Sequence, residues 1–174
     1  ALGSSSVIGQ ASSVVLTGSY HEIRDAMVAD AADEADDAIL ASLPTLAQLS
    51  VRAPVTVSGL ADRLYATKAN LKALAVTGLD AQFGISDGAI TFNSAFAFDF
   101  DASDGISAGS MDFETVAVHE IGHVLGFTSV VDLLDTGYTG RVTLSTLDLF
   151  RFAPADAPAD AAQFTTAARL AAPG

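Results

Sequence analysis

The chain has 174 residues, half of them hydrophobic, and its 21 Asp and Glu against 8 Lys and Arg give a formal charge of −13. This charge argues against nucleic acid or an anionic membrane as a partner, because both would repel the protein. Cysteine is absent, so neither a disulfide nor a thiolate metal site can form. No apolar run approaches the length of a membrane span. We expect one exported, monomeric domain.

The spacing of apolar residues predicts both helices and strands. Residues four apart on one face favour helices, and alternating aromatic and β-branched residues favour strands. The acidic stretch 30–37 is expected to be a solvated face or a break between two helices, and Gly78 is a plausible helix stop. Helices are expected at 20–43, 60–76, 112–125 and 160–171, and extended segments at 14–17, 51–57, 88–101 and 143–152.

The sequence His119-Glu120-Ile121-Gly122-His123 predicts a metal site on a helix. Ser110 or Asp112 can cap the start of this helix, and Gly126 stands where a left-handed stop is expected. Side chains four residues apart lie on the same helical face. His119 and His123 can therefore bind one zinc ion, and Glu120 projects beside it as a general base that takes a proton from the zinc-activated water. The alternative is two histidines without a ligand on an otherwise apolar helix, which would be costly.

A longer pattern extends this motif. The run HEIGHVLGF, with FDFDASDGI and MDF before it and LDLFRF after it, resembles exported bacterial zinc metalloproteases of the metzincin kind, with leishmanolysin-like features. The resemblance is best over residues 85–152. It implies a secreted zinc endopeptidase acting on proteins or peptides, with an α+β, zincin-like catalytic domain whose small mixed sheet packs on helices, including the active-site helix.

The third zinc ligand of such enzymes is missing. Short-spaced metzincins carry a histidine where this chain has Ser129, and neither His nor Met follows His123. We expect a truncated catalytic domain, with an N-terminal subdomain over 1–126 and the start of a C-terminal one over 127–174, the third ligand lying outside the chain. Asp148 and Asp132 are the in-chain alternatives. Asp148 interrupts an apolar run, and a structural pair with Arg151 is the other explanation.

The resemblance also implies a place for substrate. In metzincins a strand at the sheet edge pairs with the peptide, and here residues 89–98 fit that position, with Ala89, Ile90, Thr91 and Phe92 as substrate-binding residues. The same residues can equally form a plain core strand.

Two further functions remain open from the sequence. Asp99, Asp101 and Asp104 with Gly105 resemble a calcium loop, although the spacing differs from the EF-hand pattern and a simple acidic turn explains them as well. Because the third ligand is absent, the chain could also be a non-catalytic zincin or an adhesin-like, peptide-binding module.

Overall fold

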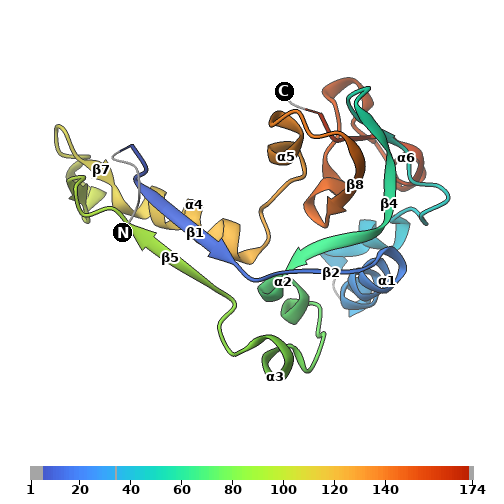
Figure 1. Cartoon of the computed structure of the whole chain (residues 1–174), viewed down its shortest axis with the longest axis horizontal. Coiled ribbons are helices and arrows are strands. Elements are labelled where there is room, and N and C mark those ends of the chain that lie inside the picture. Colours follow the sequence, from blue (N-terminus) through green and yellow to red (C-terminus); the bar gives the residue numbers. More distant parts are fainter. Residues whose placement is uncertain (1–5, 34, 173–174) are drawn as a thin grey trace.

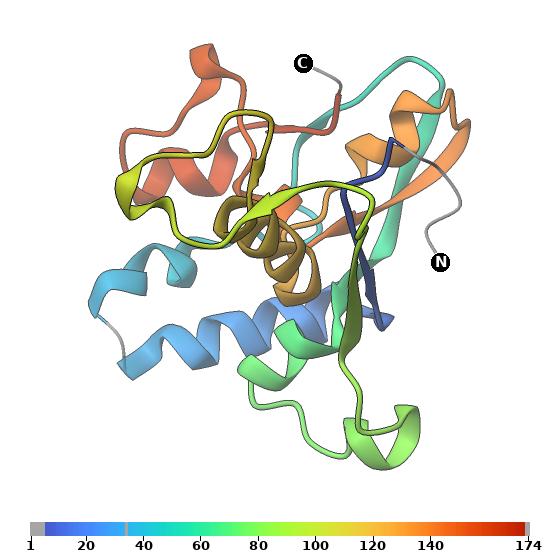
Figure 2. The same cartoon turned by 90° about the vertical axis from the view of Figure 1, so that its left-hand side faces the viewer.

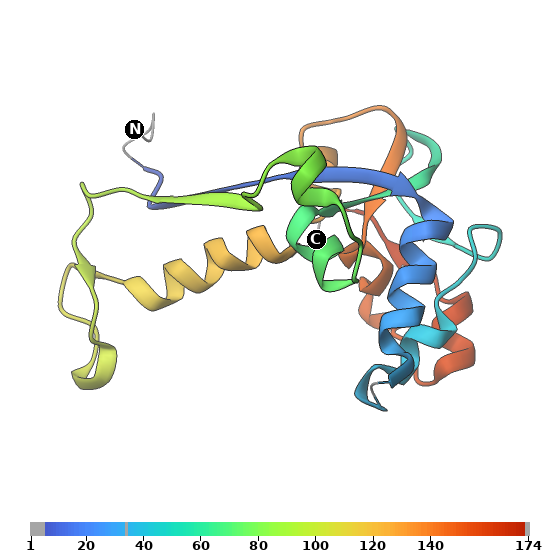
Figure 3. The ribbon, with the colours of Figure 1, turned by 90° about the horizontal axis from the view of Figure 1, so that it is seen from below.

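The structure, a computed structural model, describes residues 6–33 and 35–172. The protein has an α+β fold in which an arm extends from a larger body (Figure 1). The arm contains β1 (Gly9–Ser13), β5 (Gly88–Phe92) and α4 (Phe113–Leu125). Figure 3 shows α4 running alongside these two strands, and Figure 2 looks along the arm from its tip, with α4 close to end-on. Among the described residues, no helix is both long and apolar enough to cross a membrane.

The body is built on a three-stranded mixed sheet in the order β2-β4-β8, where β4 pairs antiparallel with β2 and parallel with β8. These strands are β2 (Val15–Ser19), β4 (Val57–Thr67) and β8 (Gly140–Ser145). The surrounding helices are α1 (Tyr20–Asp30), α2 (Lys68–Ala73), α3 (Leu79–Phe83), α5 (Val131–Asp135) and α6 (Ala161–Thr166). The core is apolar and includes Tyr20, Ile23, Met27, Leu64, Leu144, Leu149 and Phe164.

Short elements complete the chain. β3 (Val51–Arg52) pairs parallel with β9 (Arg169–Leu170), and β6 (Phe98–Asp99) pairs parallel with β7 (Met111–Asp112). In the described residues, 3-10 helices lie at Ala31–Asp33, Ala35–Ser42, Ala102–Asp104, Leu147–Phe150 and Pro154–Asp156.

The prediction of a helix over residues 60–76 is wrong for most of that segment. Residues up to Thr67 form β4, the central strand of the mixed sheet, and only α2 after it is helical. The leucines of this segment recur at a helical spacing, but two partner strands from distant parts of the chain pair with it, and such pairing overrides local preference. The Thr67 side chain then accepts a hydrogen bond from Asn70 N and begins α2.

The other predicted elements are present in part. The prediction of an extended segment over 143–152 is wrong beyond Ser145, because Leu147–Phe150 form a 3-10 helix, and the helix predicted over 160–171 is α6 followed by β9. Helical structure occupies 20–43 with a break in the acidic stretch, since α1 gives way to 3-10 helix. A mixed sheet is present, but it forms the body, and α4 packs instead on the separate β1–β5 pair. Only Val51–Arg52 of the predicted segment 51–57 is a separate strand, and Val57 already belongs to β4.

A buried lysine fixes the segment that leads into β5. The Lys68 side chain is fully buried, with Nζ 2.7 Å from Asp80 Oδ1 and 3.0 Å from Asp87 Oδ1. It also donates to the carbonyl oxygens of Gly84 and Ser86. Burial lowers the pKa of Lys68, but the two carboxylates outweigh this effect and hold it above its ordinary value. The start of β5 is therefore anchored to α2.

Helix α2 ends with an alanine where glycine is usual. Val76 N donates to Leu71 O and Ala75 N to Lys72 O, the two bonds of a Schellman motif, and Ala75 has a φ of 58°. We expect Ala75→Gly to stabilise the protein by about 0.5–1 kcal/mol, because glycine adopts this conformation without strain. Ala73→Gly, inside the helix, should lower the stability instead. Urea denaturation of both variants tests this, and a loss of stability in both would contradict it.

Candidate active site

The predicted helix over 112–125 is confirmed as α4, and local signals explain both of its ends. The Asp112 carboxylate accepts hydrogen bonds from Glu114 N at 3.1 Å and Thr115 N at 3.3 Å, which satisfies amides that have no partner within the helix. Gly126 ends the helix with a φ of 112°, in the left-handed region that a side chain disfavours. Gly126 therefore sets the direction in which the chain leaves the helix.

The two histidines of the motif point at the same place. Nε2 of His119 and Nε2 of His123 are 3.1 Å apart, and the rings meet edge-on at 86°. His123 Nδ1 lies 3.0 Å from the carbonyl oxygen of Phe127, so a proton on Nδ1 can be donated to that oxygen, which leaves the Nε2 lone pair free. Such a hydrogen bond orients metal-binding histidines in many proteins.

This arrangement fits a zinc ion. Two nitrogens bound to one tetrahedral zinc at 2.0–2.1 Å lie about 3.3–3.4 Å apart, close to the 3.1 Å between the two Nε2 atoms. When no ion lies between them, the same atoms can share a proton in an N–H···N hydrogen bond. The donor set of two imidazoles suits zinc better than calcium or magnesium, which prefer oxygen ligands.

Glu120 lies under strand β1. Its side chain is buried, with 6 % of the residue exposed, and it makes no hydrogen bond or ion pair with the residues that the structure describes. A Cβ atom placed on Gly9 would lie 2.9 Å from Glu120 Oε1 and 3.1 Å from its Cγ. Glycine at this position therefore leaves the room that the carboxylate occupies. Neither carboxylate oxygen is among the fully enclosed unpaired atoms of the described residues, so the carboxylate keeps some contact with solvent. A largely covered carboxylate that meets water but no protein partner is a candidate for proton transfer.

The β1–β5 pair covers the face of α4 that carries Glu120. Ser13 Oγ, at the end of β1, donates to the carbonyl oxygen of His123 at 3.0 Å. Phe92, at the end of β5, packs against Phe113 in a tilted arrangement with ring centroids 4.8 Å apart. Both ends of the strand pair are thus attached to the helix that carries the histidines.

The register of this pair separates the four predicted substrate-binding residues into two kinds. Val14 N donates to Asp87 O and Asn93 N to Ile8 O, at the two ends of an antiparallel ladder. Because hydrogen-bonded pairs alternate in such a ladder, the backbones of Ala89 and Thr91 face β1. The N–H and C=O groups of Ile90 and Phe92 point to the other edge, where the described residues supply no partner strand.

Among the described residues, no third ligand joins the two histidines. In the described part of the chain, no group of three His, Cys, Asp or Glu residues is close enough to hold a metal ion. Asp148 is buried and accepts hydrogen bonds from Ser129 Oγ at 2.6 Å, Val130 N at 3.0 Å and Ser145 N at 2.8 Å. Its Oδ1 is also 3.7 Å from Arg151 Nη1. The structural pair of Asp148 with Arg151 is therefore present. The hydrogen bonds of Asp148 link the segment after α4 to the end of β8.

The remaining polar candidates lie apart from the histidines. Asp132 is exposed in the first turn of α5. Asp99 accepts from Asp101 N and Ser107 N, and Asp101 accepts from Ser103 N, so these carboxylates organise their own loop. Hydrogen bonds from Ser107 lower the pKa of Asp99, and those from Ser103 lower the pKa of Asp101. Calcium binding by this loop stays a prediction.

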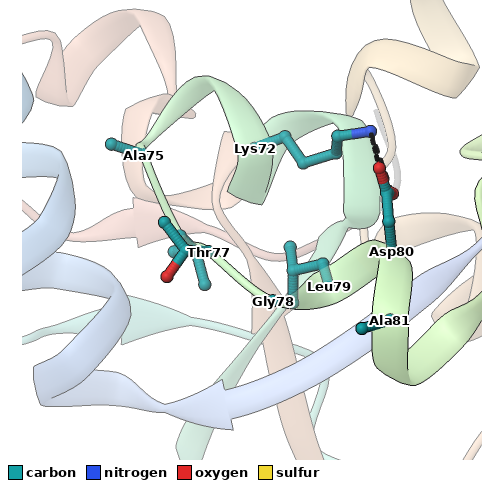
Figure 4. Close-up of a pocket in the computed structure, with 8 residues that line it drawn as sticks. Lys72, Ala75, Thr77, Gly78, Leu79, Asp80 and Ala81 are labelled. Carbon is teal, nitrogen blue, oxygen red and sulfur yellow. Dashed lines mark hydrogen bonds and ion pairs between the residues drawn. The ribbon is translucent and has the colours of Figure 1, made fainter.

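A pocket of about 550 Å³ lies between α2 and α3 (Figure 4). It is lined by Lys72, Asp80 and the turn 75–79, and Lys72 reaches across to Asp80 in the figure. None of the three motif residues lines it, and its lysine and aspartate already neutralise one another. We assign it no part in the site.

The face of α4 away from the strands is apolar and exposed. Val118, Ile121 and Leu125 are 61 %, 45 % and 56 % exposed, and Phe127 beyond the helix is exposed as well. On the other side of the helix, Val116 and Val124 are partly covered. The arm contacts the body at the end of α4 and at the start of β5, and the exposed side chains show that this face of α4 stays open.

Sequence reasoning missed two contributors to the site, Gly9 and the carbonyl oxygen of Phe127. A contact between residues 9 and 120 has no local signal, because only folding brings them together. Gly126 was the available signal for Phe127, since a left-handed helix stop turns the next residues back towards the last turn. No protein-family model, curated protein or solved structure matches the chain.

Proposed function

We propose that this protein is an extracellular zinc-dependent endopeptidase of the zincin type. The observation that carries the proposal is the convergence of two imidazole nitrogens, 3.1 Å apart, on the helix that also carries Glu120, whose side chain is largely covered and has no partner in the described residues. The sequence pattern H-E-x-x-H-x-x-G-F supports the same function.

Each residue has a defined task in this mechanism. When bound, zinc would act as a Lewis acid on water and on the scissile carbonyl. His119 and His123 would hold it, with His123 oriented by its hydrogen bond to Phe127 O. Glu120 would accept the proton of the attacking water and deliver it to the leaving amine. The outer edge of β5, at Ile90 and Phe92, would pair with the backbone of an extended peptide.

Zinc titration and peptide cleavage test the proposal together. We expect the purified chain to bind one zinc ion per molecule by calorimetry, with affinity limited by its two ligands, and to cleave unfolded casein in a chelator-sensitive reaction. His119→Ala and His123→Ala should each abolish the binding, whereas His21→Ala, at an exposed histidine on α1, should not. Equal zinc affinity in all four proteins would overturn the proposal.

The lack of a third ligand among the described residues favours one alternative, a non-catalytic module that binds peptide along β5. This protein would bind extended peptides without cleaving them, and zinc would not change the affinity. Chelator-sensitive turnover of casein by the same chain excludes the alternative.

Gly9 offers a specific check on the position of Glu120. In Gly9→Ala the new Cβ would lie 2.9 Å from Glu120 Oε1, so the carboxylate must move. We expect kcat to fall about tenfold to a hundredfold, since small displacements of catalytic groups have effects of this size. Zinc affinity, which depends on the histidines, should stay unchanged.

Gly18→Ala is the matched control for this substitution. It lies in β2, the next strand along the chain, and its new Cβ would meet Ile23 Cδ1 at 3.0 Å, a similar crowding far from the motif. It should lower stability without lowering kcat per folded molecule. If both variants lost the same fraction of kcat, Gly9 would have no particular relation to Glu120.

A further inference from the structure

An aromatic surface is exposed at the N-terminal end of α4. Phe100 is 76 % exposed although its ring centroid is 4.7 Å from that of Phe113, so one face is covered and much of the ring is open to solvent. Ile106, in the loop between β6 and β7, is 46 % exposed, and Met111, the first residue of β7 and the partner of Phe98 in β6, is 39 % exposed. We call Phe100, Ile106 and Met111 the loop surface. Large exposed apolar side chains that recur on one short segment can mark an interaction site.

The charge around the loop surface has one sign. Residues 73–140 contain no Lys or Arg. Their only ion pairs with Lys or Arg in the described structure are those of Asp80 and Asp87 with Lys68 and Lys72. Asp99, Asp101 and Asp104 flank the loop surface and are not neutralised by a cation. A field of one sign attracts a partner of the opposite charge and repels one of the same charge.

The loop surface is continuous with the edge proposed to bind substrate. β5 runs towards Phe92, whose ring packs on Phe98 and Phe113, the same aromatic cluster that carries Phe100. The chain then enters the loop beyond the end of β5 (Figure 3). A peptide paired with Ile90 and extended past Phe92 would therefore reach the loop surface with one of its flanks.

We propose that the loop surface binds one flank of a cationic peptide, in which an aromatic or large aliphatic side chain stands beside Lys or Arg. The apolar side chain would cover Phe100, and the cation would lie between the exposed ring and the aspartates, where cation–π and ionic attraction add. This inference rests on the proposed pairing of peptide with β5, and it names the class of substrate that the site selects.

Binding of two matched peptides tests it. Both are labelled ten-residue peptides with the same central sequence, one with Phe-Arg-Lys on a flank and the other with Ser-Gln-Glu there, measured by fluorescence anisotropy on the chain with Glu120→Gln to prevent cleavage. We expect the cationic peptide to bind at least about tenfold more tightly. Phe100→Ser should remove most of this difference, and the pair Asp101→Asn and Asp104→Asn should weaken the cationic peptide about twofold to fivefold.

The control variants lie on the body. Val55→Ser removes a fully exposed apolar side chain before β4, and Asp62→Asn removes an exposed charge within it. Neither should change either affinity. Equal binding of the two peptides, or a preference that survives Phe100→Ser, would overturn the inference. Binding is measured without turnover, so the two proposals can fail separately. If the chain cleaves casein in a chelator-sensitive reaction but binds both peptides equally, only this inference is contradicted. If it prefers the cationic peptide but cleaves nothing, only the proposed peptidase activity is contradicted.

Discussion

Glu120→Gln is expected to lower peptide hydrolysis by about 10²–10⁴-fold, the usual contribution of a general base, and to leave zinc affinity unchanged. The amide has the shape of the carboxylate but cannot accept the proton of the attacking water. The same substitution removes a charge that has no hydrogen-bond or ion-pair partner in the described residues and keeps some contact with solvent, so the variant should unfold at about the same urea concentration as the parent or a slightly higher one. Lower activity with equal or greater stability is the pattern of a group kept for catalysis.

Glu114→Gln is the control for this result. Glu114 lies in the first turn of the same helix, exposed to solvent, and its substitution should change hydrolysis little. A Glu120→Gln protein that cleaved casein as fast as the parent would contradict the mechanism. A large loss of stability in that variant would show that Glu120 has a structural partner instead.

Asp148→Ala should have the largest effect on stability. The Asp148 carboxylate is 1 % exposed and receives hydrogen bonds from Ser129, Val130 and Ser145. Without it these buried donors lose their acceptor, and each buried group left unpaired costs about 1–3 kcal/mol. We expect a loss of about 3 kcal/mol or more, measured as a shift of the urea midpoint at constant slope.

Asp160→Ala makes the comparison specific. Asp160 caps α6 through Gln163 N, at 2.8 Å, in an exposed position, and loss of such a cap costs about 1 kcal/mol. Equal losses in the two variants would mean that the hydrogen bonds of Asp148 contribute no more than one surface cap. The Asp148→Ala variant also separates the two explanations of this residue. If Asp148 were a zinc ligand, its substitution would lower the zinc affinity of the protein, whereas a structural residue would affect mainly the stability.

The part of the site that could be predicted from the sequence is local. The limits of α4 follow from Asp112 and Gly126, each within a few residues of the helix end that it determines. The convergence of His119 and His123 follows from the pitch of one helix turn. These features depend on neighbours in the chain, so a single sequence contains what is needed to predict them.

The part that could not be predicted depends on distant pairing. The sequence of β4 predicts a helix, because its leucines recur at a helical spacing. Its partner strands lie more than 40 residues away in the chain, and the segment contains no local signal for that pairing. The same holds for Gly9, which meets Glu120 only after β1 has packed on α4. Lys68 likewise would be expected at the surface, and its burial depends on two aspartates that folding brings to it.

The alternating ladder between β1 and β5 has a consequence for hydrogen exchange. Amide protons of Ala89 and Thr91 are held between the strands and should exchange slowly, while those of Ile90 and Phe92 face water and should exchange fast. The slow amides of Ala89 and Thr91 therefore serve as an internal reference for the exchange rates of Ile90 and Phe92 in the same strand. A bound ligand that extends the ladder would slow only the fast pair, so residue-resolved mass spectrometry or NMR would locate the contact without any knowledge of what the ligand is.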